Sequence, residues 1–160
     1  MLRVTSSVRI YLIIYCKGQC SRADEHFAHS QVPLHPVQKF QSDAERMLAV
    51  ILDRDSQKWF RPATGQFQIS YRLGSTYHDY QPDFVAELDD RIVMLEPKAR
   101  NQMTDPDVLA KRDAAVAWCQ RATEHAATSG GKPWSYALIP HDAIQENWGL
   151  DAIENRWTIS

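Results

Sequence analysis

The sequence predicts an α/β fold in which helices cover both faces of a mixed central sheet. Three observations support this prediction: an apolar stripe at helical spacing in residues 44–51, two short β-rich segments within residues 84–95, and a long helical segment between these and a last apolar strand at residues 134–140. A helix that connects two strands of one sheet is a crossover, so the strands it joins run parallel, whereas a hairpin is antiparallel. The sheet is therefore expected to be mixed.

The composition is that of a soluble globular protein with one domain. The 160 residues are enough for a single core, and 44% hydrophobic with 24% charged residues is typical of that class. A net charge of −2 provides no general attraction to nucleic acid, so any contact with DNA must come from a local basic patch. Three cysteines, an odd number, are typical of a reducing compartment, and the apolar run near the N-terminus is too short to span a membrane. A cytoplasmic protein without membrane contact is expected.

The chain is expected to divide into an N-terminal arm, residues 1–39, and a domain, residues 40–160. The apolar run at residues 8–15 predicts a strand, or the remnant of a longer upstream sequence. The polar stretch that follows contains Pro33 and Pro36, which is typical of a linker.

Inside the domain, the first helix is predicted to begin after Ser42. Its apolar stripe consists of Ala44, Met47, Leu48 and Ile51. Strands are predicted at residues 57–61 and 67–73, and residues 74–81 are expected to lead from them into the hairpin.

The later helices are indicated by their ends. Asp105 and Pro106 predict the start of the crossover helix, which is expected to run to about Thr128 and to stop at the glycine pair that begins with Gly130. After the last strand, residues 141–146 are predicted to form a short helix. The chain has no Walker-type phosphate loop, so no ATP site is expected in it.

The most informative pattern is an Asp…Glu-x-Lys series around the predicted hairpin. Residues 84–88 and 91–95 are expected to pair as antiparallel strands through a two-residue turn, and the same register places Asp83 directly opposite Glu96. Two anions so close together repel each other unless a cation lies between them. Side chains alternate along a strand, so Lys98 is expected on the face of Glu96. The nearby positions are apolar on both faces: Val85 and Met94 with Glu96, and Phe84, Ala86, Val93 and Leu95 on the other side.

These residue types suit a divalent metal. Mg²⁺, or Mn²⁺ in its place, prefers oxygen ligands and keeps several waters, so the candidate ligands are the carboxylates of Asp83 and Glu96 and the backbone carbonyl of Pro97. A bound cation lowers the pKa of a coordinated water, and the Lys98 ammonium can orient that water or stabilise an oxyanion. The pattern therefore favours metal-dependent phosphodiester hydrolysis. The other interpretation is two solvated carboxylates at a strand end with a lysine beside them.

The motifs and their order resemble a known group of nucleases. The Asp83 and Glu96-Pro97-Lys98 series is similar to the motif of the PD-(D/E)xK nuclease superfamily. Five segments also resemble, in the same order, the C-terminal endonuclease domain of the restriction subunit of type III restriction enzymes: SDAERMLAVILD, KWF, GQFQISY, YQPDF and VMLEPKA. The resemblance implies a restriction-endonuclease-like three-layer core with the element order αβββαβ.

The resemblance also implies a role for each site residue. The metal-binding acid of the family corresponds to Asp83, its second acid to Glu96, its catalytic lysine to Lys98, and the acid of its first helix to Glu45. For Glu45 a second interpretation stays open, because Ser42 and Glu45 have the spacing of a capping box, in which Glu45 would bond back to the Ser42 amide.

One position departs from a regular central strand, and three others are candidates for contact with DNA. Pro97 lacks a backbone donor, so strand pairing is expected to end there. Arg100 lies just beyond the motif, and Lys111 and Arg112 lie on the crossover helix, where they can contact phosphate or simply form a solvated surface.

The function predicted from the sequence is that of a Mg²⁺-dependent endodeoxyribonuclease domain that acts on DNA. The resemblance implies work with a separate helicase or translocase, or with a modification subunit, and is compatible with a homodimer. The alternative is a catalytically silent DNA-binding or assembly module, the remnant of a larger restriction or helicase protein.

Overall fold

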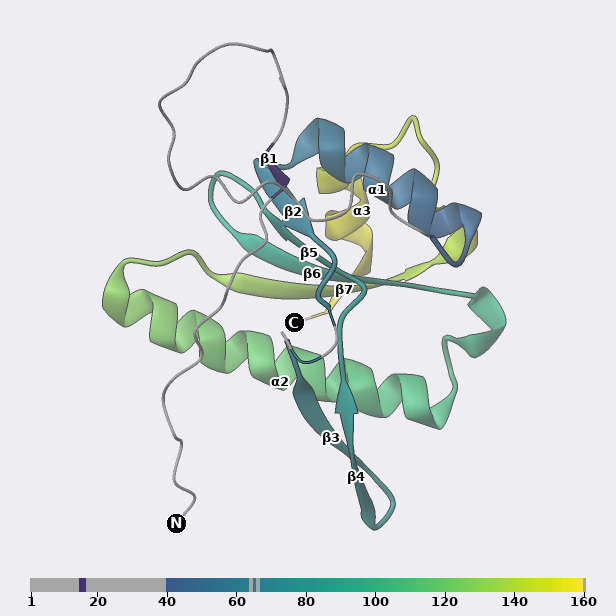
Figure 1. Ribbon diagram of the computed structural model, residues 1–160, viewed down its shortest axis with the longest axis vertical. Helices are drawn as coiled ribbons and strands as arrows, with labels where there is room; N and C mark the ends of the chain where they lie inside the picture. The colour runs from purple at the N-terminus through teal and green to yellow at the C-terminus, as the bar shows by residue number, and fades with distance from the viewer. Residues whose placement is uncertain (1–14, 17–39, 64, 66, 160) are drawn as a thin grey trace.

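The computed structural model describes residues 15–16, 40–63, 65 and 67–159 (Figure 1). The arm and linker predicted for residues 1–39 therefore lie outside the described residues, except for the strand β1 (Tyr15–Cys16), which pairs with β2 (Lys58–Phe60). The division of the chain at residue 39 stays a prediction.

The central sheet of the described chain is mixed, as the sequence predicts. Its strand order is β1-β2-β5-β6-β7-β8. Beyond β1 and β2, these strands are β5 (Phe84–Glu87), β6 (Ile92–Lys98), β7 (Trp134–Pro140) and β8 (Thr158–Ile159). The pair β6 and β7 is parallel and every other neighbouring pair is antiparallel.

Helices cover the sheet on both sides. In Figure 1, α1 (Asp43–Asp55) and α3 (Leu150–Trp157) lie on one side of the sheet and α2 (Pro106–Ser129) lies on the other. Two short 3₁₀ helices, η1 (Arg100–Gln102) and η2 (His141–Ala143), follow β6 and β7. Each face of the sheet thus has its own hydrophobic core.

The two long helices begin where the sequence predicts, and α2 also ends where predicted. The Ser42 hydroxyl accepts the Glu45 N–H at the start of α1 (3.2 Å), and the Asp105 carboxylate accepts the Asp107 N–H at the start of α2 (2.8 Å). Gly130 ends α2 with a φ of 69°, a left-handed conformation that glycine adopts without strain.

The predicted hairpin register is confirmed. Phe84 pairs with Leu95, and Val85 pairs with Met94. Because strand side chains alternate, the first pair belongs to the core under α1 and α3, and the second pair belongs to the core under α2.

The expectation that pairing ends at Pro97 is wrong. Strand β6 continues to Lys98, and Pro97 is the register partner of Ile139 on β7. The ladder with β5 has already ended at the pair Phe84 and Leu95. At Pro97 the strand therefore has a paired neighbour on one side, so its missing N–H is tolerated.

Three further differences concern the elements around the hairpin. Residues 74–81, expected as a connection, contain β4 (Thr76–Tyr80), which pairs with β3 (Ile69–Leu73) in a separate two-stranded sheet. The helix predicted at 141–146 is only the 3₁₀ turn η2, and the sequence analysis predicted neither α3 nor β8. These elements depend on distant partners: β3 packs on α2, and α3 packs on β7.

Candidate functional site

The predicted acids and lysine meet at the end of β6. Glu96 and Lys98 lie two residues apart on this strand, and Asp83 directly precedes β5. Tyr80, the last residue of β4, lies against the same place. Since Met94 packs in the core under α2, strand alternation puts Glu96 and Lys98 on the α2 side of the sheet.

Glu96 is a buried carboxylate with a donor on each oxygen. Its side chain is 4% exposed. The Oε2 atom accepts hydrogen bonds from the Tyr80 hydroxyl (2.8 Å) and the Asp83 backbone N–H (3.3 Å), and Oε1 accepts one from Lys98 Nζ (2.8 Å). These contacts hold the carboxylate in one orientation and balance its charge with the ammonium of Lys98.

The Asp83 carboxylate is close enough to Glu96 for the two charges to interact. Burial and the negative charge of Glu96 together raise the pKa of Asp83 from 3.8 to about 7, against the opposing effect of Lys98. Glu45 and Arg61 have smaller effects of opposite sign on the same pKa. Asp83 therefore retains its proton close to neutral pH unless a cation replaces it.

Lys98 remains a cation in this environment. Burial by itself would lower its pKa, but the attraction of Glu96, Asp83 and Glu45 outweighs burial, so the pKa of Lys98 lies above 10.5. A permanently protonated ammonium donates hydrogen bonds and does not accept a proton.

Two buried tyrosines, neither of them predicted from the sequence, complete the site. Burial raises the pKa of Tyr80 and of Tyr136, and the charge of Glu96 raises both further, so both hydroxyls stay protonated. Tyr136 is the register partner of Met94 on the neighbouring strand. The parallel pairing of β6 and β7 was the available signal for Tyr136, whereas Tyr80 depends on the unpredicted strand β4.

Glu45 lies near the site without joining the acid pair. Its side chain is 7% exposed, and its Oε2 accepts hydrogen bonds from Arg61 (2.9 Å) and from the Gln41 backbone N–H (3.2 Å). That amide is one residue before the Ser42 amide expected of a capping box, although Ser42 does cap the helix. Glu45 thus serves the helix start and Arg61, and acts on Asp83 and Lys98 through charge alone.

The donor set fits Mg²⁺ bound by few protein ligands. Within the described ranges, no three His, Cys, Asp or Glu side chains converge as a metal-binding group. Mg²⁺ commonly uses one or two carboxylates and keeps its remaining waters. The coupled carboxylates of Asp83 and Glu96, with the carbonyl of Pro97 between Glu96 and Lys98, match that requirement.

The three basic residues expected to contact DNA border the site, and each is ion-paired. The pairs are Arg100 with Asp142 (2.7 Å), Lys111 with Asp107 (2.5 Å) and Arg112 with Asp113 (2.6 Å). Lys111 lies close enough to Lys98 for their charges to interact. Contact of these residues with DNA stays a prediction, and their own acids already offset much of their charge.

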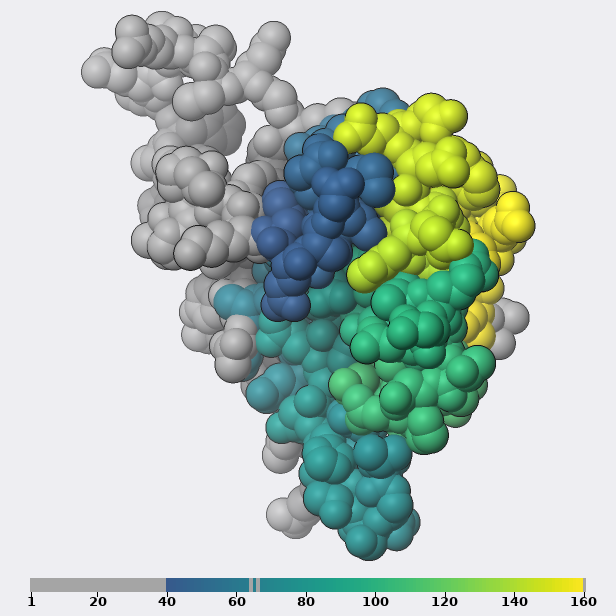
Figure 2. Space-filling view, turned by 90° about the vertical axis from the view of Figure 1, so that its right-hand side faces the viewer, coloured from purple at the N-terminus to yellow at the C-terminus, as the bar shows by residue number. Residues whose placement is uncertain are grey.

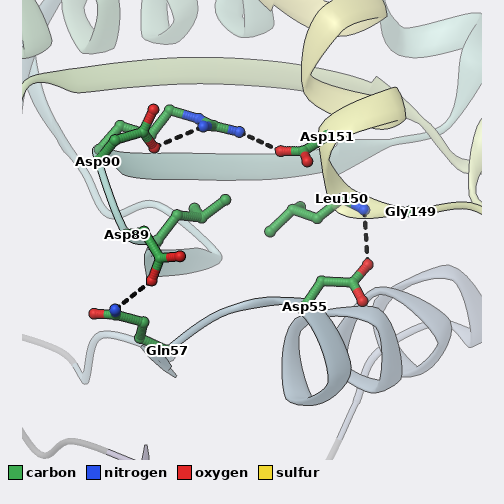
Figure 3. A pocket seen from close by; sticks show the side chains of 9 residues that line it. Asp55, Gln57, Asp89, Asp90, Gly149, Leu150 and Asp151 are labelled. Atoms are coloured by element: carbon green, nitrogen blue, oxygen red, sulfur yellow. Dashed lines mark hydrogen bonds and ion pairs between the residues drawn. The ribbon is translucent and has the colours of Figure 1, made fainter.

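A pocket lies at the other end of the hairpin. It has a volume of about 380 Å³ and lies at the turn between β5 and β6, where four of its nine lining residues are aspartates (Figure 3). Asp55 accepts the Leu150 N–H (2.9 Å), and Arg91 bonds to Asp90 and Asp151. The site at Glu96 is therefore distinct from this pocket, which joins α1, the turn and α3.

Comparison with protein-family models, curated proteins and solved structures gives no match for this chain. The resemblance to the PD-(D/E)xK superfamily stays a prediction that rests on the sequence motifs. Across the described ranges, no helix combines the length and the apolar character needed to cross a bilayer.

Proposed function

We propose that this chain is a Mg²⁺-dependent endodeoxyribonuclease domain of the PD-(D/E)xK type. The observation that carries the proposal is the half-buried Asp83 beside the buried Glu96, with Lys98 bonded to Glu96, at the end of a central strand. A protein gains no stability from placing two carboxylates where their charges conflict. Such a conflict is expected where a cation is to be bound.

The order of the elements also supports the proposal. Helix α1, strands β2, β5 and β6, helix α2 and strand β7 follow one another along the chain. This is the order αβββαβ that the resemblance implies, with Asp83 directly before the second of these strands and Glu96 on the third. The small sheet of β3 and β4 is an insertion in that series.

Each residue has a role in the proposed reaction. Asp83, Glu96 and the Pro97 carbonyl would hold Mg²⁺, which when bound lowers the pKa of a coordinated water and offsets charge on the phosphate. Lys98, a permanent cation, donates hydrogen bonds to the attacking water or to a phosphate oxygen and does not act as the general base. Tyr80 holds Glu96 in position through its hydroxyl.

A plasmid-nicking assay with and without Mg²⁺ or Mn²⁺ tests the proposal. The wild-type chain should convert supercoiled plasmid to nicked and linear forms only with metal, and Asp83→Ala should abolish this. Asp89→Asn is the matched control, because Asp89 is an exposed acid at the opposite end of the hairpin. No metal-dependent cleavage by the wild type, or equal cleavage by Asp83→Ala, would refute the proposal.

One observation favours the alternative of a catalytically silent DNA-binding or assembly module. Both oxygens of Glu96 already accept hydrogen bonds, and Lys98 already balances its charge. In the same assay, such a module would retain DNA without cutting it. Both the nuclease domain and the silent module would need a protein partner. The candidates are a separate helicase or translocase, a modification subunit and a second copy of this chain.

A further inference from the structure

The small sheet of β3 and β4 is a ribbon that projects from the body beside the site. Figures 1 and 2 show it extending past α2 and away from the central sheet. Its root is packed: Ile69, Tyr71 and Tyr80 are buried, and the Tyr71 hydroxyl donates to Asp107 on α2 (2.7 Å). Its outer end, residues 72–77, is exposed.

One face of the ribbon is turned away from α2. Register partners in an antiparallel pair share a face, which places Ser70 with Asp79 and Arg72 with Tyr77. The Tyr77 side chain is 74% exposed. The Arg72 guanidinium lies 6.0 Å from the Tyr77 ring centroid, so cation and aromatic ring form one unit near the tip.

Arg72 differs from the basic residues around the site. Its Nε donates to the Gly74 carbonyl (2.9 Å), and none of the described acids forms an ion pair with it. Arg100, Lys111 and Arg112 each have a carboxylate partner instead. Arg72 therefore keeps its positive charge available for a phosphate.

The ribbon is directly continuous with the site. Strand β4 runs from Thr76 near the tip to Tyr80, whose hydroxyl bonds to Glu96. Four residues of extended strand span about 13 Å. A nucleic acid held with one phosphate at Lys98, which bonds to Glu96, would therefore pass within reach of Arg72 and Tyr77.

We propose that the ribbon of β3 and β4 enters the major groove of duplex DNA beside the phosphate held by Lys98, with Arg72 on a backbone phosphate and Tyr77 against the groove wall. The inference rests on the proposed function. The major groove is about 12 Å wide and accepts a two-stranded ribbon. Asp79 lies on the same face nearer the body, where its carboxylate accepts the Ser70 hydroxyl (2.9 Å), so the attraction is confined to the tip.

The test is binding of a short DNA duplex to the full chain in EDTA, followed by fluorescence anisotropy over a range of salt concentrations. Arg72→Ala with Tyr77→Ala should raise Kd about tenfold, and Arg72→Ala alone should reduce the salt slope by about one. Asp79→Asn should tighten binding, since it removes a repelling charge. Circular dichroism and thermal melts check that each variant is folded.

Arg121→Ala is the matched control for the loss of one positive charge. Arg121 is an exposed residue of α2, ten positions after Lys111 and thus about 15 Å further along the helix. Its Kd and salt slope should equal those of the wild type.

The outcomes separate the two proposals. If the wild type cleaves DNA with Mg²⁺ while the double variant binds duplex as tightly as the wild type, the ribbon does not contact DNA and a protein becomes the candidate occupant. If the ribbon variants lose affinity although the wild type shows no metal-dependent cleavage, the contact stands and the nuclease proposal fails. If the wild type neither binds nor cleaves DNA, both proposals fail.

Discussion

Glu96 is the central residue of the site, because it is buried and accepts hydrogen bonds from three parts of the chain. Tyr80, Lys98 and the backbone of Asp83 supply its donors. A buried carboxylate that loses a donor retains the full cost of its desolvation. Single substitutions around Glu96 should therefore lower the free energy of unfolding by amounts large enough to measure.

Tyr80→Phe should destabilise the protein by about 2 kcal/mol, because it removes a hydrogen bond to a buried charged group. Urea denaturation measures the change. Tyr77→Phe is the control: Tyr77 is the exposed tyrosine of the same ribbon and should leave the urea midpoint unchanged. Equal effects of the two substitutions would show that the Tyr80 hydroxyl does not support Glu96.

Asp83→Asn should stabilise the metal-free protein at alkaline pH. The folded pKa of Asp83, about 7, lies above its ordinary value of 3.8, so the folded state binds the proton more tightly than the unfolded state. Wild-type stability should then fall as the pH rises from about 4 to about 7, by an amount on the order of 3 kcal/mol when Asp83 is fully ionised. Asparagine cannot ionise, so the variant escapes this loss.

Urea midpoints of wild type and Asp83→Asn, compared at about pH 5 and about pH 8, measure this linkage. The advantage of the variant should grow with pH. A difference that is the same at both pH values would contradict the raised pKa of Asp83.

At the scale of elements, Arg91 joins the hairpin to α3. Its guanidinium bonds to Glu154 (2.6 Å), which is only 6% exposed, and also to Asp90 and Asp151. The first N–H of α3, that of Leu150, also donates to Asp55 on α1 (2.9 Å). The position of this helix, which no local pattern predicted, thus depends on Arg91, on that bond and on the apolar packing of α3.

Arg91→Ala should destabilise the protein by about 3 kcal/mol, because it leaves the buried Glu154 without its counter-charge. Thermal or urea unfolding measures the loss. Arg46→Ala, which breaks exposed ion pairs of α1, should leave the stability nearly unchanged. The double change Arg91→Met with Glu154→Leu should recover most of the stability, and failure to do so would assign the loss to the packing of the arginine stem.

The elements with local signals were predictable, and those without them were not. Asp105, Pro106 and Gly130 predict the two ends of helix α2. The apolar residues of its two strands predict the hairpin. Strand β4 has four exposed residues out of five and lacks the apolar alternation of a half-buried strand. It becomes a strand because β3 offers a partner that is itself held on α2.

At the scale of the whole molecule, the sheet brings Asp83 and Glu96 together in a way that leaves their charges in conflict. A divalent cation that binds only the folded chain stabilises it by mass action. Millimolar Mg²⁺ should therefore raise the melting temperature of the wild type at about pH 8 by a few degrees. EDTA should reverse this shift.

Glu96→Gln should lose the Mg²⁺ response, whereas Glu124→Gln, an exposed acid of α2, should keep it. Differential scanning fluorimetry is sufficient for the comparison. The same shift in both variants would identify a general salt effect and would remove the metal site from the proposal.

The sequence alone determined the register of the hairpin, the alternation of its faces and the ends of the long helices, since each depends on residues that are neighbours along the chain. Tertiary structure decided the hydroxyl donor to Glu96 from β4, the pairing of Glu45 with Arg61, and the ion pair of Arg100 with Asp142. Each of these contacts joins residues at least 16 positions apart, whereas the ion pairs of Lys111 and Arg112 are local to α2. Whether a charged side chain faces a ligand or another part of the protein depends on what folding places beside it, and no local pattern carries that information.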